Sequence, residues 1–231
     1  MSAVTAETRP HEAARQMYLR AQQILRDHAS HSTPYGVSFQ GLTLRVDQQV
    51  FSPTSTPSTL LLARHLVVHR GDRVLDVGTG TGALALLAAQ RTSSTVLATD
   101  VSSDAVECAR QNIKEARAAV EARQSDLFET IGGNERFTLI IFNPPFADAE
   151  PRAMLERSVF DYRHATLDRF LREAPLYLAS EGRIVTVFGG YERELPLAQL
   201  ARHYRYRTRI LAETTIDVHL VVYELTCPPV D

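Results

Sequence analysis

Asn143, Pro144, Pro145 and Phe146 end an apolar run over residues 137–142, and their chemical types suit the binding of a flat N–H donor. The side-chain oxygen of Asn143 and the backbone carbonyl of Pro144 can each accept one N–H from a planar amide or amine. The prolines supply no competing N–H and hold φ at about −65°, and Phe146 can stack on the planar group. The pattern indicates a site for a planar nitrogen. Its alternative is a strand stopped by prolines beside a core phenylalanine.

A glycine-rich loop lies earlier in the chain, where Gly78, Gly80 and Gly82 follow the β-rich run 73–77 and open a helical segment. Glycines let such a loop turn tightly and approach a small ligand. The spacing differs from the G-x-G-x-x-G of dinucleotide-binding folds. Asp76 also stands directly before the glycines, where its charge would repel a pyrophosphate but hold an ammonium group. The loop therefore favours a cationic cofactor, unless the glycines only let strand and helix pack closely.

Two further acids follow the next β-rich runs. Asp100 ends the run 95–99 and can accept both hydroxyls of a ribose, while Val101 can cover one face of an adenine. Asp100 alone does not separate the cofactors, because nicotinamide enzymes place an acid at a similar interval. Asp126, after the run 120–123, can reach the exocyclic amine of an adenine, and a helix cap is an equally good explanation for it.

In this order and spacing, VLDVGTGTG, ATDVSSDAV, SDLF and FNPPF resemble the class I S-adenosylmethionine-dependent methyltransferases. The closest resemblance is to the small-domain branch with protein glutamine methyltransferases acting on release factors and several rRNA and tRNA base N-methyltransferases. It covers about residues 50–225 and implies S-adenosylmethionine as the cofactor. For the cofactor site it implies Asp76, Gly78, Thr79, Gly80, Asp100, Val101, Asp126, Leu127 and Asn143. For catalysis it implies Asn143, Pro144, Pro145 and Phe146, with no metal.

Methyl transfer from a sulfonium is an in-line displacement, so the placing of the acceptor lone pair supplies most of the catalysis. No dedicated general base is required, and His164, which follows the motif, is not assigned a catalytic role. Two alternatives come from other classes of protein. A nicotinamide-dependent oxidoreductase is opposed by the loop spacing and Asp76, and a cofactor-binding scaffold without turnover is opposed by the intact Asn143.

The sequence leaves the methyl acceptor open between a protein glutamine amide, a nucleobase amine and a small metabolite. Residues 50–66 resemble the segment before the glycine loop in the glutamine enzymes, but Thr56 and Pro57 stand where those enzymes have an acid. Arginines and aromatics interleave over 202–209, which suits RNA contact or, more plainly, protection of an edge strand. A formal net charge of −2 counts modestly against nucleic acid.

Periodicity predicts the elements that position these residues. Apolar residues at helical spacing predict a docking helix over 11–28, and alternating runs around Gly41 predict a hairpin over 35–53. Strands are expected at 73–77, 95–99, 120–123, 138–142 and 183–188, and helices from about Thr59 and at 83–91, 103–118, 167–180 and 191–203. A C-terminal antiparallel hairpin completes an α/β doubly wound sheet. The resemblance implies a Rossmann-like sheet of seven strands, order 3-2-1-4-5-7-6, with strand 7 antiparallel.

Length and composition bear on the domain organisation and the cellular location of the protein. With 231 residues and 44% hydrophobic content the chain suits one large domain with an attachment. We expect an N-terminal helix and hairpin extension at 1–50 and a cofactor-binding methyltransferase domain at 51–231. Apolar stretches are too short to span a membrane, and two cysteines give no disulfide framework. These features predict a cytoplasmic protein, with its oligomeric state left open.

Overall fold

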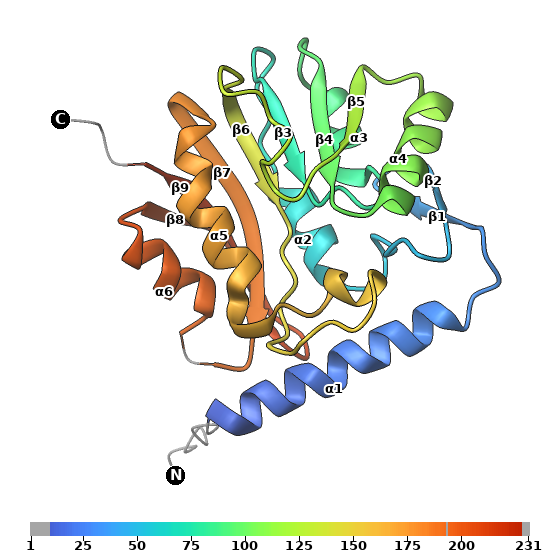
Figure 1. Ribbon diagram of the computed structural model, residues 1–231, viewed down its shortest axis with the longest axis vertical. Helices are drawn as coiled ribbons and strands as arrows, with labels where there is room; N and C mark the ends of the chain where they lie inside the picture. Colours follow the sequence, from blue (N-terminus) through green and yellow to red (C-terminus); the bar gives the residue numbers. More distant parts are fainter. Residues whose placement is uncertain (1–9, 193, 228–231) are drawn as a thin grey trace.

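The computed structural model describes residues 10–192 and 194–227. A seven-stranded sheet forms its centre, in the order β5-β4-β3-β6-β7-β9-β8 (Figure 1). The strands are β3 (Val74–Val77), β4 (Val96–Asp100), β5 (Val120–Gln124), β6 (Phe137–Phe142), β7 (Leu178–Gly190), β8 (Arg207–Thr215) and β9 (His219–Thr226). β9 runs antiparallel to both neighbours, and the other pairs are parallel. Numbered along the chain within the sheet, this is the expected order 3-2-1-4-5-7-6, which is thereby confirmed.

Five helices of the described chain cover the two faces of the sheet, and α1 (Pro10–Ala29) crosses its carboxyl edge (Figure 1). The five are α2 (Pro57–His65), α3 (Ala83–Ala89), α4 (Ser103–Ala116), α5 (Ala165–Glu173) and α6 (Pro196–His203), with 3-10 turns η1 (Leu155–Ser158), η2 (Tyr162–His164) and η3 (Ala174–Leu176). Strand residues alternate between two cores. Val74 packs beneath α2, α3 and α4, whereas Leu75 packs beneath α5 and α6. The parallel strands are therefore apolar on both faces, as their sequences require.

The expected helix over 167–180 is wrong beyond Glu173. α5 ends there, η3 carries Pro175, and β7 already begins at Leu178. Pro175 lacks the N–H of a helix interior and its ring crowds the preceding turn. The apolar residues after it join the sheet instead, which extends β7 to 13 residues.

The N-terminal hairpin pairs β1 (Tyr35–Phe39) with β2 (Leu42–Val46), as expected. Gln40 and Gly41 between them both have positive φ, at 48° and 83°, which suits the twist of a two-residue hairpin turn. Leu44 is buried in the same core as α3 and α4. The hairpin thus packs on the main sheet's helices, and its treatment as a separate unit with residues 1–50 stays a prediction.

A buried amide connects this hairpin to the glycine loop. Asn112 on α4 accepts the Arg45 N–H at 2.8 Å and donates to the Arg45 carbonyl at 2.9 Å. Its amide nitrogen also donates to the Thr81 carbonyl at 2.9 Å. One side chain therefore holds β2, α4 and the loop in register.

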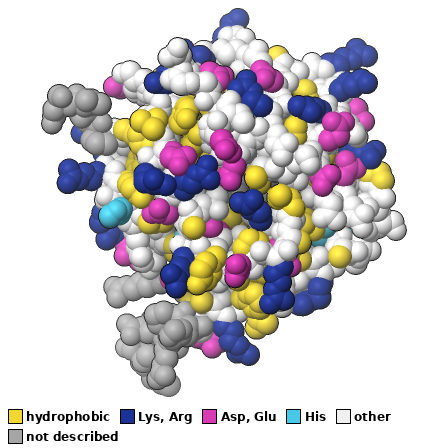
Figure 2. All heavy atoms as spheres, in the orientation of Figure 1, with side chains coloured by type: hydrophobic (Ala, Val, Ile, Leu, Met, Phe, Trp, Pro, Cys, Tyr) yellow, Lys and Arg dark blue, Asp and Glu magenta, His cyan; other side chains and the backbone are white. Residues whose placement is uncertain are grey.

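Charged groups of both signs are interspersed over the face in Figure 2, in keeping with the small net charge. Within the described ranges, the helices lack the combined length and apolarity needed to cross a bilayer. Across those same residues, His, Cys, Asp and Glu side chains form no group of three or more placed to hold a metal ion.

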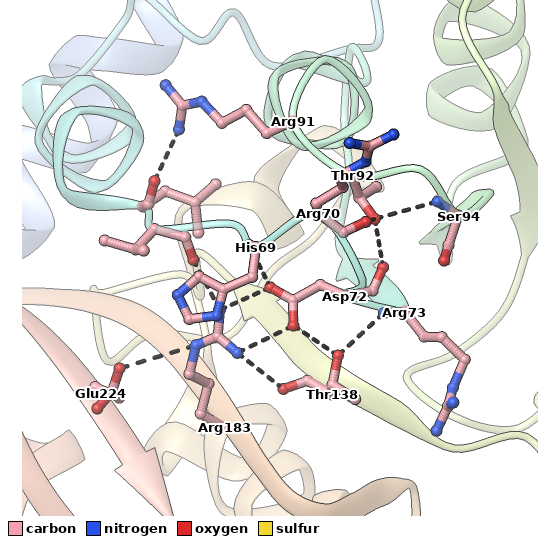
Figure 3. Close-up of polar contacts among 12 residues, drawn as sticks. His69, Arg70, Asp72, Arg73, Arg91, Thr92, Ser94, Thr138, Arg183 and Glu224 are labelled. Atoms are coloured by element: carbon pink, nitrogen blue, oxygen red, sulfur yellow. Dashed lines mark hydrogen bonds and ion pairs between the residues drawn. The ribbon is translucent and has the colours of Figure 1, made fainter.

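The amino edge of the sheet is closed by a buried ion pair between Asp72 and Arg183 (Figure 3). Asp72 is 5% exposed, and its two oxygens accept from Arg183 Nη1 and Nη2 at 3.2 and 2.8 Å. The Thr138 hydroxyl and the His69 N–H each donate at 2.7 Å. Burial raises the pKa of Asp72, but these donors outweigh it and lower the pKa to about 2. This cluster ties the start of β3 to β6 and β7.

Candidate functional site

A deep cavity opens at the opposite, carboxyl edge, beyond the ends of β3, β4 and β6. Ligands settle at this edge in open α/β sheets, where the crossovers diverge to either face. The structure brings nearly all of the predicted site residues to its walls. These are Gly78, Thr79, Gly80, Asp100, Val101, Asp126, Leu127, Asn143, Pro144, Pro145 and Phe146. Asp76 is the predicted residue that does not line it.

The glycine loop has a backbone that requires its glycines. Gly78, Gly80 and Gly82 have φ of 67°, 56° and 83°, a region that other residues rarely adopt. A Cβ on Gly82 would also lie 3.4 Å from the Ala109 Cβ on α4. Left-handed backbone and close helix packing thus both explain the motif, and neither excludes a ligand against its open side.

Asp76 lies behind this loop, with 1% of its surface exposed. One carboxylate oxygen accepts from the Thr79 hydroxyl at 2.6 Å and from the Ala85 N–H at 3.1 Å. Burial raises the pKa of Asp76 to about 7, against the opposing effect of these donors. Asp76 therefore fixes the loop to the first turn of α3, and its direct contact with a cofactor stays a prediction.

Asp100 reaches into the cavity from the end of β4. Its oxygens accept from the Gly80 N–H and the Ser102 N–H, both at 2.9 Å. Burial raises the pKa of Asp100, while these hydrogen bonds and the charge of Arg157 lower it. Among the described residues, no basic side chain comes within the 4.0 Å of an ion pair to Asp76 or Asp100. Asp76 is buried and Asp100 is half-buried, and neither has an ion-pair partner among the described residues, which suits a positively charged ligand and not a pyrophosphate.

Asn143 follows β6 and has an oriented side chain. Its amide nitrogen donates to the Thr59 hydroxyl on α2 at 3.0 Å. Thr59 is 6% exposed and lines the same cavity. With the nitrogen bound to Thr59, the amide oxygen of Asn143 is the atom left to accept from a substrate. The sequence singled out residues 50–66 for their resemblance to the glutamine enzymes but did not predict this pairing.

Phe146 packs on β7 and presents its ring to the cavity. Its centroid lies 4.9 Å from that of Phe188 at an interplanar angle of 38°. A Cβ on Gly189 would lie 3.1 Å from the Phe146 ring. The glycine therefore lets the ring sit directly on the strand, and the predicted stacking on a substrate would use the cavity side of this ring.

Comparison with known proteins assigns this arrangement to a family. The chain matches the methyltransferase small domain family over residues 41–215. The protein belongs to this family. It is 30% identical over 187 residues to a release factor glutamine methyltransferase of Streptococcus pneumoniae, covering 74% of this chain and 65% of that one. It is 35% identical over 148 residues to a tRNA adenine N6-methyltransferase of Parabacteroides distasonis, covering 62% of each.

A solved structure gives the same fold. It is a T. thermophilus 16S rRNA guanosine N2-methyltransferase in complex with S-adenosylmethionine and guanosine. The TM-score is 0.64 at 22% identity, covering 83% of this chain and 50% of that chain. The protein spans less than two thirds of each of these three relatives. The family makes it an S-adenosylmethionine-dependent methyltransferase.

The cavity of this methyltransferase fits the cofactor on its own chemistry. Asp76 and Asp100 have no ion-pair partner among the described residues, which suits a ligand that carries an ammonium and a sulfonium. The Asp126 carboxylate already has a partner within the protein. Arg169 on α5 donates to its carboxylate at 3.0 Å and to its carbonyl at 3.1 Å. No local pattern in the sequence links these two residues, which lie 43 positions apart.

The N-terminal helix supplies a wall of the cavity that sequence reasoning also missed. Met17, Arg20, Ala21 and Ile24 of α1 all line it. The helical periodicity predicted a face that docks, but it could not show that this face lies across the cavity.

Proposed function

We propose that this methyltransferase transfers the methyl group of S-adenosylmethionine to a planar nitrogen. The observation that carries the proposal is the orientation of Asn143. Its amide nitrogen is held by Thr59 at 3.0 Å, and both residues line the cavity that the glycine loop shares. The amide oxygen is then placed to accept an N–H from a substrate beside the cofactor.

The residues of the motif would activate the acceptor by binding two of its hydrogens. A planar amide or amine holds its lone pair in conjugation, so it is a weak nucleophile. When the Asn143 oxygen and the Pro144 carbonyl each accept one N–H, the nitrogen becomes more tetrahedral and its developing positive charge is stabilised. Bound S-adenosylmethionine supplies an electrophilic methyl on a cationic sulfur. The nitrogen forms the new N–C bond as the C–S bond breaks, and its surplus proton passes to water.

The remaining site residues would hold the donor. Gly78, Thr79 and Gly80 give it a close backbone surface, Asp100 accepts from its ribose, and Val101 covers its adenine. Asp126 and Leu127 border the far end of the adenine. The Asp76 carboxylate would attract the donor's ammonium group from behind the loop, and the two would come closer if the loop adjusts to the donor. The geometry that supports these roles is the shared cavity wall.

Three acceptors were open from the sequence, and two relatives bear on them. The relatives' names specify a glutamine of a release factor and an adenine of tRNA. Each of these groups carries a planar nitrogen. Family membership favours methyl transfer over the nicotinamide-dependent alternative. We place the reaction in the cytoplasm, because both cysteines, Cys108 and Cys227, are free thiols in the structure.

Asn143→Ala tests the proposal directly. Loss of one oriented acceptor should lower kcat about 100-fold or more, while the Kd for S-adenosylmethionine changes by less than about threefold. Transfer would be measured with tritiated methyl donor on a cell extract, and Kd by calorimetry. Undiminished transfer with intact donor binding would show that Asn143 does not activate the acceptor.

The matched control is Asn134→Ala. Asn134 is an exposed asparagine in the turn between β5 and β6, outside the cavity wall. Its replacement should leave kcat and Kd unchanged, which separates loss of the oriented amide from loss of an asparagine in general.

A further inference from the structure

α1 crosses the carboxyl edge of the sheet, below the ends of the central strands in Figure 1. Its inner face turns Met17, Ala21 and Ile24 toward the cavity that holds the Asn143 motif. Met17 is 6% exposed and Ala21 3%. The helix is therefore the outer wall of the acceptor end of the site.

Contacts along the length of α1 hold this wall in place. Met17 and Ala21 share an apolar cluster with residues 159–160 and with Val218 and Leu220 at the start of β9. The Tyr18 ring stacks on Phe160 with centroids 5.4 Å apart. These contacts fix the middle of α1 on both sides of the cavity.

Polar contacts secure the helix at two further points. Arg20 forms an ion pair with Asp217 in the turn before β9. His28, which is 3% exposed, bonds to the Gln48 carbonyl at 3.0 Å next to β2. A protein loop or a folded RNA could reach Asn143 from this side only by displacing α1 and breaking these contacts.

The walls around the acceptor end are mainly apolar. Besides the α1 residues they include Phe51, Phe146 and Leu220. Most of the neutral polar side chains on this wall already have partners. The Asn143 amide bonds to the Thr59 hydroxyl, the Thr56 and Ser58 hydroxyls bond to each other, and the Ser158 hydroxyl donates to the Leu155 carbonyl.

Charged groups on the cavity wall are paired or belong to the donor end. Arg20 pairs with Asp217, and Asp126 pairs with Arg169. Arg157 is close enough to Asp100 for its charge to lower the pKa of that carboxyl. An acceptor that carried its own charge would thus lose its hydration at the acceptor end without finding a partner there.

We infer that the acceptor is a small, uncharged, largely apolar molecule with one flat amide or heteroaromatic amine nitrogen. It lies between α1 and Phe146, with its N–H groups on Asn143 and Pro144. This inference rests on the proposed function and narrows it, since it disfavours a glutamine on an intact protein and a base in folded RNA. Asn143 and Pro144 bind the nitrogen, and the rest of the molecule is recognised mainly by shape and apolar contact.

The first test asks where the label goes. A cell extract is incubated with the full-length enzyme and tritiated S-adenosylmethionine, then divided by ultrafiltration, and the low-mass part is partitioned between water and ethyl acetate. We expect label in the ethyl acetate phase, and loss of that label with Asn143→Ala.

The other outcomes are distinct. Asn143-dependent label on protein or RNA, or in the aqueous low-mass phase, overturns the inference but leaves nitrogen methylation standing. No label in any fraction, although calorimetry shows donor binding, overturns the proposed function as well.

The second test fills the proposed pocket from α1. Ala21→Trp places a large ring in the acceptor space and should weaken acceptor use about tenfold or more, with donor Kd changed less than about threefold. Acceptor use is measured as the dilution of the low-mass fraction that half-saturates transfer. Leu19→Trp is the control, because Leu19 lies on the same helix, is 47% exposed and is not part of the cavity wall.

Ile24→Ala covers the case in which the tryptophan variant does not fold. It enlarges the same pocket without adding bulk and should also shift the half-saturating dilution. If Ala21→Trp and Ile24→Ala, or whichever of them folds, leave the half-saturating dilution as unchanged as Leu19→Trp does, α1 does not border the acceptor and the inference is wrong.

Discussion

The two edges of the sheet bury carboxylates in opposite ways. At the amino edge Asp72 has its cation inside the fold, and its pKa is lowered to about 2. At the carboxyl edge Asp76 and Asp100 have backbone and hydroxyl donors but no ion-pair partner in the described chain, and their pKa values are raised. A buried charge needs a partner. The first edge supplies one from β7, whereas the second supplies none from the described chain, and we propose that the cationic cofactor takes this role beside Asp100.

Removing the partner at the amino edge should have the largest effect on stability. Asp72→Ala leaves the Arg183 guanidinium, whose side chain is 13% exposed, with the more distant Glu224 carboxylate at 3.9 Å in place of its close partner. We expect the free energy of unfolding to fall by about 3–5 kcal/mol, measured by urea denaturation with circular dichroism.

The control is an ion pair on the surface. Glu121→Ala removes a pair to Arg123 in which the acid is 57% exposed, and it should cost less than about 1 kcal/mol. Equal effects of the two variants would contradict the structural role given to the Asp72 cluster.

The raised pKa of Asp76 predicts a pH dependence of opposite sign to that of Asp72. An Asp with an unfolded pKa of about 3.9 and a folded pKa of about 7 favours the fold most at low pH. Its contribution is lost as pH rises from about 4 through about 7. The stability of the donor-free protein relative to Asp76→Asn should therefore decline over this window, as measured by denaturation at several pH values.

The pH dependence that Asp72 contributes to stability falls in a different pH range from that of Asp76. Its lowered pKa stabilises the fold above about pH 4, and that contribution is lost only as pH falls toward about 2. A relative stability of wild type and Asp76→Asn that is flat between about pH 4 and 8 would show that Asp76 is not destabilised by burial.

Asp100→Asn tests whether a carboxylate at the carboxyl edge contributes to donor binding and not to stability. The amide keeps the size of the side chain and one acceptor for Gly80 or Ser102, but it loses the charge that a ribose hydroxyl would bond to. We expect the Kd for S-adenosylmethionine to rise about tenfold, with stability changed by less than about 1 kcal/mol. Calorimetry and urea denaturation measure the two. A loss of stability as large as that of Asp72→Ala would mean that the carboxyl edge is built like the amino edge.

The smallest effect on activity is expected at Thr59, whose hydroxyl accepts a hydrogen bond from Asn143 within the carboxyl edge. Thr59→Val removes the hydroxyl that holds the Asn143 amide but keeps the side-chain shape. The kcat should fall about three- to tenfold with donor Kd unchanged, because the amide oxygen is less well oriented. Thr59→Ser retains the hydroxyl and should restore most of the rate. If the valine and serine variants have the same kcat, Thr59 does not position Asn143.

Much of the fold was predictable because it depends on local pattern. Apolar runs such as 137–142 mark buried parallel strands, and the glycines at 78, 80 and 82 mark a loop that only they can form. The strand order followed from resemblance to a family and was confirmed by the sheet. The boundary between α5 and β7 was misplaced because the apolar pattern continues from one to the other, and the only breaker in the short η3 segment between them is Pro175.

The unpredicted parts of the site are contacts between segments distant in sequence. Thr59 bonds to Asn143 across 84 positions, and Arg169 bonds to Asp126 across 43. Side-chain type alone does not select such partners from the many Thr and Arg residues of the chain. The wall formed by α1 was missed for the same reason, since periodicity defines a helix face but not the surface that it covers.

Gly189 has a consequence for the size of the reaction space. The ring of Phe146 rests directly on bare backbone there, and an added Cβ would stand 3.1 Å from the ring and 2.5 Å from Leu220. An alanine at this position would force the Leu220 side chain to move and would press on the Phe146 ring, and both residues line the cavity. The absence of a methyl group at this one position of β7 thus lets Leu220 and Phe146 lie close to the strand and keeps that volume of the cavity open.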